Sequence, residues 1–154
     1  MNGFAEESLV KSGQLNSYLE MLRSEAQKLN FSNKSEEAIL KIQKEIIEKN
    51  HATAVDYGLL GGFFLSSKQF VKAEEAYLKA ISLNKSELNY QLQLAHIYMF
   101  TNRLNKAKDI HKKYKQNNLS GNKSWASQTK TDLQQFEKNG FATDNFKKIL
   151  RVLD

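Results

Sequence analysis

The amino-acid sequence predicts an all-α protein built from antiparallel helical hairpins. Its 154 residues include no proline, against an average usage of about 5%, and helices tolerate that absence well. No segment alternates apolar and polar residues in the way that a half-buried strand does. Residues 54–87 instead alternate large aromatic and small side chains at helical spacing, which is typical of helices packed in pairs.

Clusters of Asn, Ser and Gly mark the expected turns. Ser35, Ser86 and Thr143 are predicted N-caps, because their hydroxyls can accept hydrogen bonds from free first-turn amides. Segment 119–124 is the most loop-like stretch and predicts a joint before the last two helices. The helices expected between these breaks cover residues 3–12, 15–29, 36–49, 53–66, 69–83, 87–101, 104–117, 123–138 and 144–152.

The clearest hairpin covers residues 54–87. Two antiparallel helices pack closely only when small side chains on one helix face large side chains on the other. The residues that supply this alternation are Tyr57, Leu60, Gly61 and Phe64 in the first helix and Phe70, Ala73, Tyr77 and Ala80 in the second. A single hairpin cannot bury its apolar stripe alone, so neighbouring hairpins are expected to stack on it.

These eight positions in a 34-residue unit resemble the tetratricopeptide repeat (TPR) family. A second unit matches less fully, because His111 stands where an aromatic residue belongs and Tyr114 where a small residue belongs. A third register starts at Asn122, places Trp125 at the early aromatic position and then decays. The resemblance implies a right-handed superhelix of antiparallel helix hairpins (a TPR-like α-solenoid) in one domain, 1–154, with repeats 54–87 and 88–121 and degenerate capping helices over 3–50 and 122–154.

In that family the first helix of each repeat lines a concave groove that binds a partner protein. The groove residues that the resemblance implies here are Val55, Gly58, Leu59, Gly62, Leu65, Asn89, Leu92, Gln93, His96, Met99, Lys123 and Lys130. The part from the first unit is apolar, and an exposed apolar patch usually has a partner. Gly58 and Gly62 each cost a helix about 1 kcal/mol relative to alanine, a cost that close approach of another helix to the backbone would explain.

Two occupants of this groove fit the sequence. One is internal, either the first helix or the last. The apolar residues that would fill the groove are Phe4, Leu9 and Val10, or Phe141, Phe146, Ile149, Leu150 and Leu153. The other occupant is an apolar or amphipathic helix of another protein. Three alternatives stay open: the groove residues pack inside the superhelix, the chain forms a homodimer through the groove, or it is a non-catalytic assembly or substrate-binding part of a larger enzyme or secretion complex.

Charge is distributed unevenly along the chain. Residues 1–100 carry 11 basic and 12 acidic groups, whereas residues 101–154 carry 12 basic and 5 acidic groups. Lys112, Lys113 and Lys115 predict a basic rim that steers an acidic partner. The second half contains only two arginines, and arginine is the residue suited to bidentate contacts with phosphates and bases, which argues against a nucleic-acid partner.

The sequence predicts no enzyme, cofactor or metal site. His51, His96 and His111 lie far apart without a carboxylate or second histidine at metal spacing, so each is expected at the surface or half-buried. There is no cysteine, no apolar run long enough to span a membrane, and no signal-peptide pattern at the N-terminus. The compartment stays open: the cytoplasm is favoured, and an exported form whose signal has been removed also fits.

Overall fold

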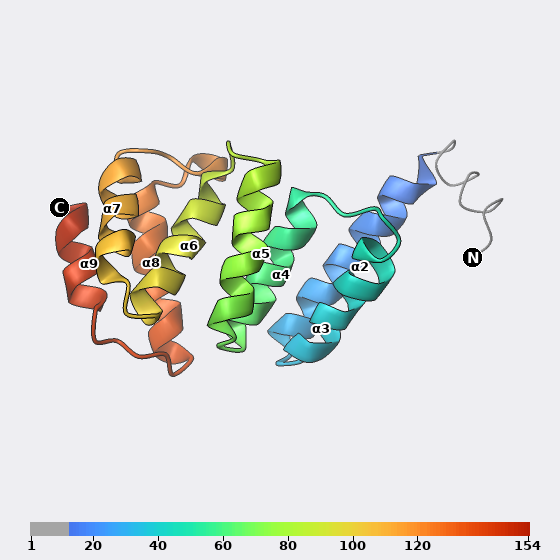
Figure 1. Ribbon diagram of the computed structural model, residues 1–154, viewed down its shortest axis with the longest axis horizontal. Helices are drawn as coiled ribbons and strands as arrows, with labels where there is room; N and C mark the ends of the chain where they lie inside the picture. The colour runs from blue at the N-terminus through green and yellow to red at the C-terminus, as the bar shows by residue number, and fades with distance from the viewer. Residues whose placement is uncertain (1–12) are drawn as a thin grey trace.

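The helices stand side by side in one row, each antiparallel to the helix before it (Figure 1). This computed structural model describes residues 13–154. Its α-helices are α2 (Gln14–Phe31), α3 (Ser35–Ile42), α4 (Ala54–Ser66), α5 (Phe70–Leu83), α6 (Leu88–Phe100), α7 (Leu104–Tyr114), α8 (Trp125–Lys138) and α9 (Phe146–Leu153). The prediction of an all-α protein is confirmed for this part of the chain. The helix expected over residues 3–12, with Phe4, Leu9 and Val10, lies outside the described residues.

The helix expected over residues 36–49 changes its winding partway. It begins as α3 and continues as a π-helix, η1 (Gln43–Ile47), in which the amide of Glu48 donates to the carbonyl of Gln43 at 2.9 Å. A π-turn inserts one extra residue per turn. This part of the sequence contains no proline or glycine that would predict the change from α-helix to π-helix.

The helix expected over residues 104–117 ends at Tyr114, because the backbone turns into a closed loop. The amide of Trp125 donates to the carbonyl of Asn117 at 3.0 Å, and the amide of Leu119 donates to Lys123 at 2.6 Å. A short 3-10 turn, η2 (Ser120–Asn122), lies between these contacts. The loop expected as a joint therefore has its own hydrogen bonds and buries Leu119.

The three predicted N-caps are wrong, because α3, α6 and α9 have Lys34, Glu87 and Asn145 at their N-cap positions. The hydroxyls of Ser35 and Ser86 donate instead to the side chains of Asn30 and Asn84, at 2.8 and 2.7 Å. Side-chain caps form at other residues, among them Glu87, which accepts from the amide of Asn89 at 3.2 Å, and Ser124, which accepts from the amide of Ser127 at 3.1 Å.

Aromatic rings resting on glycine backbone join α4 to the helices on both sides of it. A Cβ atom added at Gly61 would lie 2.6 Å from the ring of Tyr77 on α5. At Gly58 it would lie 2.6 Å from the ring of Tyr90 on α6. Both approaches are closer than a methyl group allows, so a ring from each neighbouring helix occupies the place of a side chain on α4.

The small residues of α5 behave as the spacing predicts. Ala73 and Ala80 are both 0% exposed and belong to the main apolar cluster, which also contains Phe64 and, partly buried, Tyr57. The expected interlocking of aromatic and small side chains is therefore present in the hairpin of α4 and α5. Gly62 differs from its neighbours, because a Cβ atom there would be 3.4 Å from the Tyr77 hydroxyl, an ordinary contact distance.

A buried ion pair ties α2 to α4. Asp56 is fully buried, and the Nε and Nη2 atoms of Arg23 donate to its two carboxylate oxygens at 2.8 and 2.9 Å. The backbone amide of Thr53 donates to the same carboxylate at 2.9 Å. Asp56 thus caps α4 and accepts a bidentate contact from α2, the geometry that arginine is built to supply.

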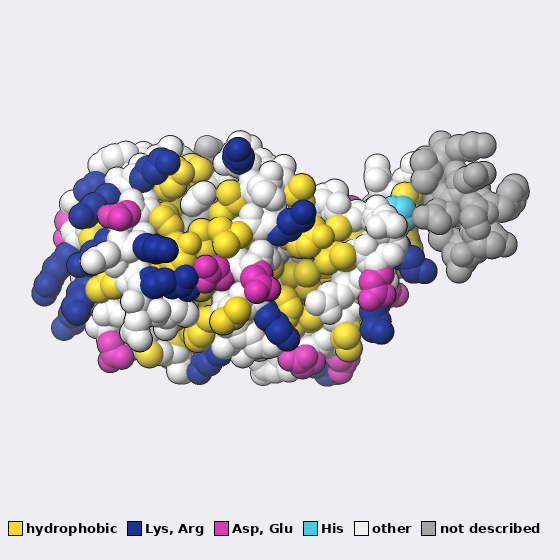
Figure 2. Space-filling model, viewed as in Figure 1, with side chains coloured by type: hydrophobic (Ala, Val, Ile, Leu, Met, Phe, Trp, Pro, Cys, Tyr) yellow, Lys and Arg dark blue, Asp and Glu magenta, His cyan; other side chains and the backbone are white. Residues whose placement is uncertain are grey.

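Aromatic residues and lysines mark the end of the row that carries the C-terminal helices. Phe100 and Phe136 pack edge to face at 5.0 Å between ring centroids, and Phe141 joins them at 5.1 and 4.9 Å. Figure 2 shows bands of apolar side chains between the helices on the viewed face, and Lys and Arg side chains gathered over the end with α7 and α9. Within residues 13–154, no helix is both long and apolar enough to cross a bilayer.

The glycine contacts predict opposite effects for two adjacent substitutions. Gly61→Ala should lower the free energy of unfolding by about 1–3 kcal/mol through overpacking against Tyr77, only partly offset by the roughly 1 kcal/mol that alanine contributes to a helix. Gly62→Ala keeps that helix gain without the clash and should raise the free energy of unfolding. Urea unfolding followed by circular dichroism measures both. Equal effects of the two substitutions would contradict the packing.

Candidate partner-binding surface

The α4 part of the predicted groove is mostly half-buried, with one residue well exposed. Val55 is 49% exposed, and Leu59, Gly58 and Gly62 are partly exposed. Val55, Leu59 and Gly62 are spaced by four and three residues, so they lie along one face of α4. Leu65 is buried in the main apolar cluster and is an interior residue, which corrects its place in the groove.

The α6 part of the predicted groove is mostly interior. Asn89 is exposed and Gln93 is partly exposed. Leu92, His96 and Met99 are buried. The prediction that these three residues line an open groove is therefore wrong, because the C-terminal helices cover them. The side chains that cover them come from α8 and α9 and the loop before α8: Leu119 and Trp125 over Leu92, Phe136 against His96, and Leu133, Phe146 and Ile149 around Met99.

The last helix, α9, packs at the end of the row. It does not cover Val55, Leu59 and Gly62 on α4, and so it does not fill the predicted groove. Ile149 and Phe146 share an apolar cluster with Met99, Ala107 and Leu133, so α9 rests on α6, α7 and α8. Phe141, in the segment before α9, packs among Phe70, Phe100 and Phe136 and belongs to the main apolar cluster. The Val55 side of α4 remains half exposed.

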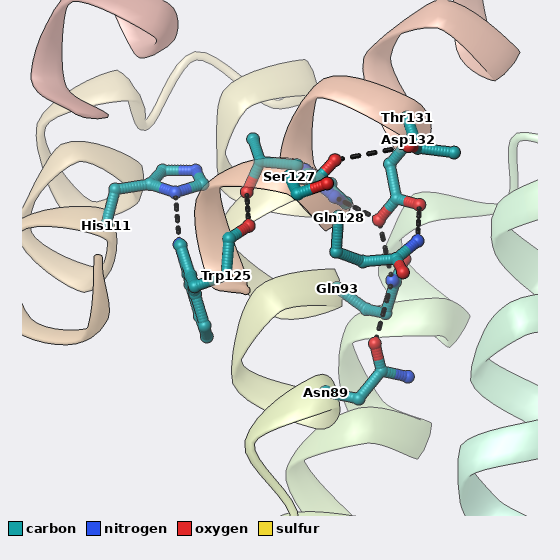
Figure 3. Close-up of polar contacts among 10 residues, drawn as sticks. Asn89, Gln93, His111, Trp125, Ser127, Gln128, Thr131 and Asp132 are labelled. Carbon is teal, nitrogen blue, oxygen red and sulfur yellow. Dashed lines mark hydrogen bonds and ion pairs between the residues drawn. The ribbon is translucent and has the colours of Figure 1, made fainter. Parts of the chain in front are cut away.

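A polar network joins α6 to α8 (Figure 3). The Nε2 atom of His96 donates to the Oδ2 atom of Asp132 at 2.9 Å. Nε2 is the donor because an ionised carboxylate can only accept hydrogen bonds. The amides of Gln93 and Gln128 donate to the same carboxylate at 3.2 and 2.7 Å. Burial raises the pKa of Asp132, but these hydrogen bonds and the His96 ring hold its pKa below the usual range.

A second polar contact joins α7 to α8. The indole Nε1–H of Trp125 donates to the Nδ1 atom of His111 at 3.0 Å, and both residues are buried (Figure 3). Nδ1 is thus an acceptor, and the ring is neutral with its proton on Nε2. Burial lowers the pKa of His111 to about 3, and the neighbouring His96, at 6.3 Å between ring centroids, adds to the effect.

These contacts correct the expectation that His96 and His111 lie at the surface or half-buried, since they are 0% and 1% exposed. His51 is partly exposed, as expected. Of the described side chains, His96 carries the buried polar atom without a hydrogen-bond partner, its Nδ1. No group of three or more His, Asp or Glu residues suited to a metal ion occurs among residues 13–154.

The three lysines of the predicted basic rim differ in their surroundings. Lys112 and Lys113 are exposed, as are the predicted groove residues Lys123 and Lys130. Lys115 is partly buried, and its ammonium donates to the carbonyls at positions 152 and 154, both at 3.2 Å. It therefore holds the C-terminal end of α9, where a cation interacts favourably with the helix dipole. This corrects the prediction for Lys115 as a free steering charge.

No protein-family model matches the chain, and no curated protein is significantly similar to it. The resemblance to TPR proteins therefore depends on residue spacing alone. Sequence reasoning did not single out Asp132 or Asp56. For Asp56 a signal existed, since Thr53 followed by an acidic residue three positions later is a capping-box pattern at the start of a helix.

The buried neutral His111 predicts a stability that falls on acidification. Its pKa is about 3 in the folded chain and about 6.5 for an exposed histidine, so between these values the unfolded chain binds a proton that the folded chain does not. The contribution is fully present above about pH 6.5 and is lost as the pH falls, by up to about 1.4 kcal/mol per pH unit. His111→Asn, whose Oδ1 can still accept from Trp125, should flatten this dependence.

Urea unfolding of both proteins between about pH 6.5 and pH 4.5 measures the difference, in a window above the titration of Asp132, whose pKa lies below its usual value. A wild-type slope in the His111→Asn variant would refute the assignment of a buried neutral ring.

Proposed function

We propose that this chain is a TPR-like helical repeat module, a right-handed superhelix of hairpins, that binds a helix or extended segment of another protein. The observation that carries the proposal is the strip of Val55, Leu59 and Gly62 along α4, which is apolar and only partly covered by the rest of the chain. Exposed apolar surface of this kind is typical of protein-interaction sites.

The glycine contacts support a partner at this strip. Internal rings account for the glycines at positions 58 and 61, but at Gly62 a Cβ atom would meet only the Tyr77 hydroxyl at an ordinary distance. A glycine inside a helix costs about 1 kcal/mol relative to alanine, and internal packing does not require that cost at Gly62. The absence of a side chain at Gly62 would let the backbone of a partner protein approach α4 closely.

Polar residues of α6 complete the proposed binding surface. Asn89 and Gln93 lie on the helix whose Tyr90 ring rests on Gly58 of α4, and Gln93 is held in place by its contact with Asp132. An apolar centre with polar side chains at its edge is the common composition of a protein interface. The mechanism is shape and apolar complementarity, without a covalent step.

Val55→Glu should abolish partner capture without unfolding the chain. Burying a carboxylate in an apolar interface is strongly unfavourable, whereas at a half-exposed helix position it changes the free energy of unfolding by only about 0.5 kcal/mol. The measurement is quantitative mass spectrometry of proteins captured from native lysate by each variant after chemical cross-linking. Val71→Glu on α5 is the matched control, since Val71 is 72% exposed and lies on the other helix of the hairpin.

Proteins captured by the wild type and by Val71→Glu, and lost with Val55→Glu and with Gly62→Leu, are the expected result. Full capture by Val55→Glu would refute the proposed surface. Light scattering of the same variants separates a homodimer from a foreign partner, because a dimer formed through this strip dissociates in Val55→Glu.

A further inference from the structure

A cleft of about 670 Å³ opens between α8 and α9, away from the strip on α4. Its floor is apolar and consists of Leu133, Phe146 and Leu150. Leu133 and Phe146 are almost fully buried beneath it, and Leu150 is partly buried. The volume lies in the range of about 300–1,000 Å³ that is usual for binding sites.

The two long walls of the cleft carry cations. Lys130 stands on the α8 wall, and Lys147 and Arg151 stand on the α9 wall, all three exposed. Within residues 13–154, no carboxylate lies within ion-pair distance of any of these three. The lining also contains two acidic residues, Glu137 and Asp154, near the C-terminal ends of α8 and α9, so the three cations outnumber the carboxylates.

A second apolar cleft lacks this charge pattern. Between α3 and α5, Glu36 and Glu75 balance Lys72 and Lys79 around an apolar floor. The two lysines there also lie over the rings of Phe64 and Tyr57, each at 5.8 Å. The α8–α9 cleft therefore favours an anionic ligand more than the α3–α5 cleft does.

We propose that the α8–α9 cleft binds an acidic amphipathic helix of another protein. The apolar stripe of that helix rests on Leu133, Phe146 and Leu150, and carboxylates on both sides of the stripe meet Lys130 on one wall and Lys147 and Arg151 on the other. Helix α9 has eight residues, about 12 Å at 1.5 Å per residue, so the cleft accommodates about two turns. The excess of 12 basic over 5 acidic groups in residues 101–154 attracts such a partner over a longer range.

Fluorescence anisotropy of the full chain with a labelled peptide tests the proposal. The probe is a synthetic helix of about 14 residues with leucines along one face and glutamates on both sides of them, and a scrambled peptide of the same composition is its control. The wild type should bind the probe at least tenfold more tightly than the scrambled peptide. Lys147→Glu/Arg151→Glu should weaken probe binding at least tenfold.

The matched control is Lys112→Glu/Lys113→Glu, which makes the same change in net charge on α7, outside the cleft lining. It should weaken binding less than threefold. Leu150→Ser tests the apolar floor at constant net charge and should also weaken binding of the probe. It tests the proposal independently if the charge-reversed variant fails to fold. Val55→Glu should leave probe binding unchanged, so failure of this proposal is distinguishable from failure of the proposed function at α4.

Equal loss in the α7 control, equal binding of the scrambled peptide, or no binding of the probe would overturn the proposal. Self-association that disappears in Lys147→Glu/Arg151→Glu would assign the cleft to a second copy of this chain and would also overturn it.

Discussion

The fold depends on two tyrosine rings that take the places of missing side chains on one helix. Tyr77 covers Gly61 and Tyr90 covers Gly58, so α4 is held between α5 and α6 at distances that no residue with a Cβ atom would permit. This contact fixes the rotation of α4 about its own axis. Leu60 and Phe64 are then turned into the main apolar cluster, Leu59 packs against its edge, and Val55 is left at the surface. The candidate surface on α4 is thus a consequence of the packing beneath it.

In the C-terminal half, hydrogen bonds between buried or partly buried side chains hold the helices together. Where the alternation of aromatic and small residues decays, α8 is fixed by two polar contacts, Trp125 with His111 and His96 with Asp132. A buried hydrogen bond between side chains specifies position more narrowly than apolar contact does, because a misplaced donor or acceptor remains unsatisfied. These contacts make the second hairpin a support for α8 and α9, and the α8–α9 cleft forms on that support.

The sequence predicted the local structure well because the signals were local. Turn residues placed the helices within a few residues, and the spacing of Gly61, Ala73 and Ala80 predicted their burial. The burial of His96 was beyond reach, because its partner Asp132 lies 36 positions away and nothing in the spacing links them. Leu92 and Met99 were placed in a groove for the same reason, since only the packing of α8 and α9 over α6 shows that they are interior.

The rings of Tyr77 and Tyr90 lie against the backbone of α4. Nuclear magnetic resonance tests this packing most directly, through nuclear Overhauser contacts between each tyrosine ring and the α-protons of the glycine beneath it. Strong contacts are expected from Tyr77 to Gly61 and from Tyr90 to Gly58, with those α-protons shifted upfield by the rings. Glycine α-protons at ordinary chemical shifts, without contacts to either ring, would contradict it.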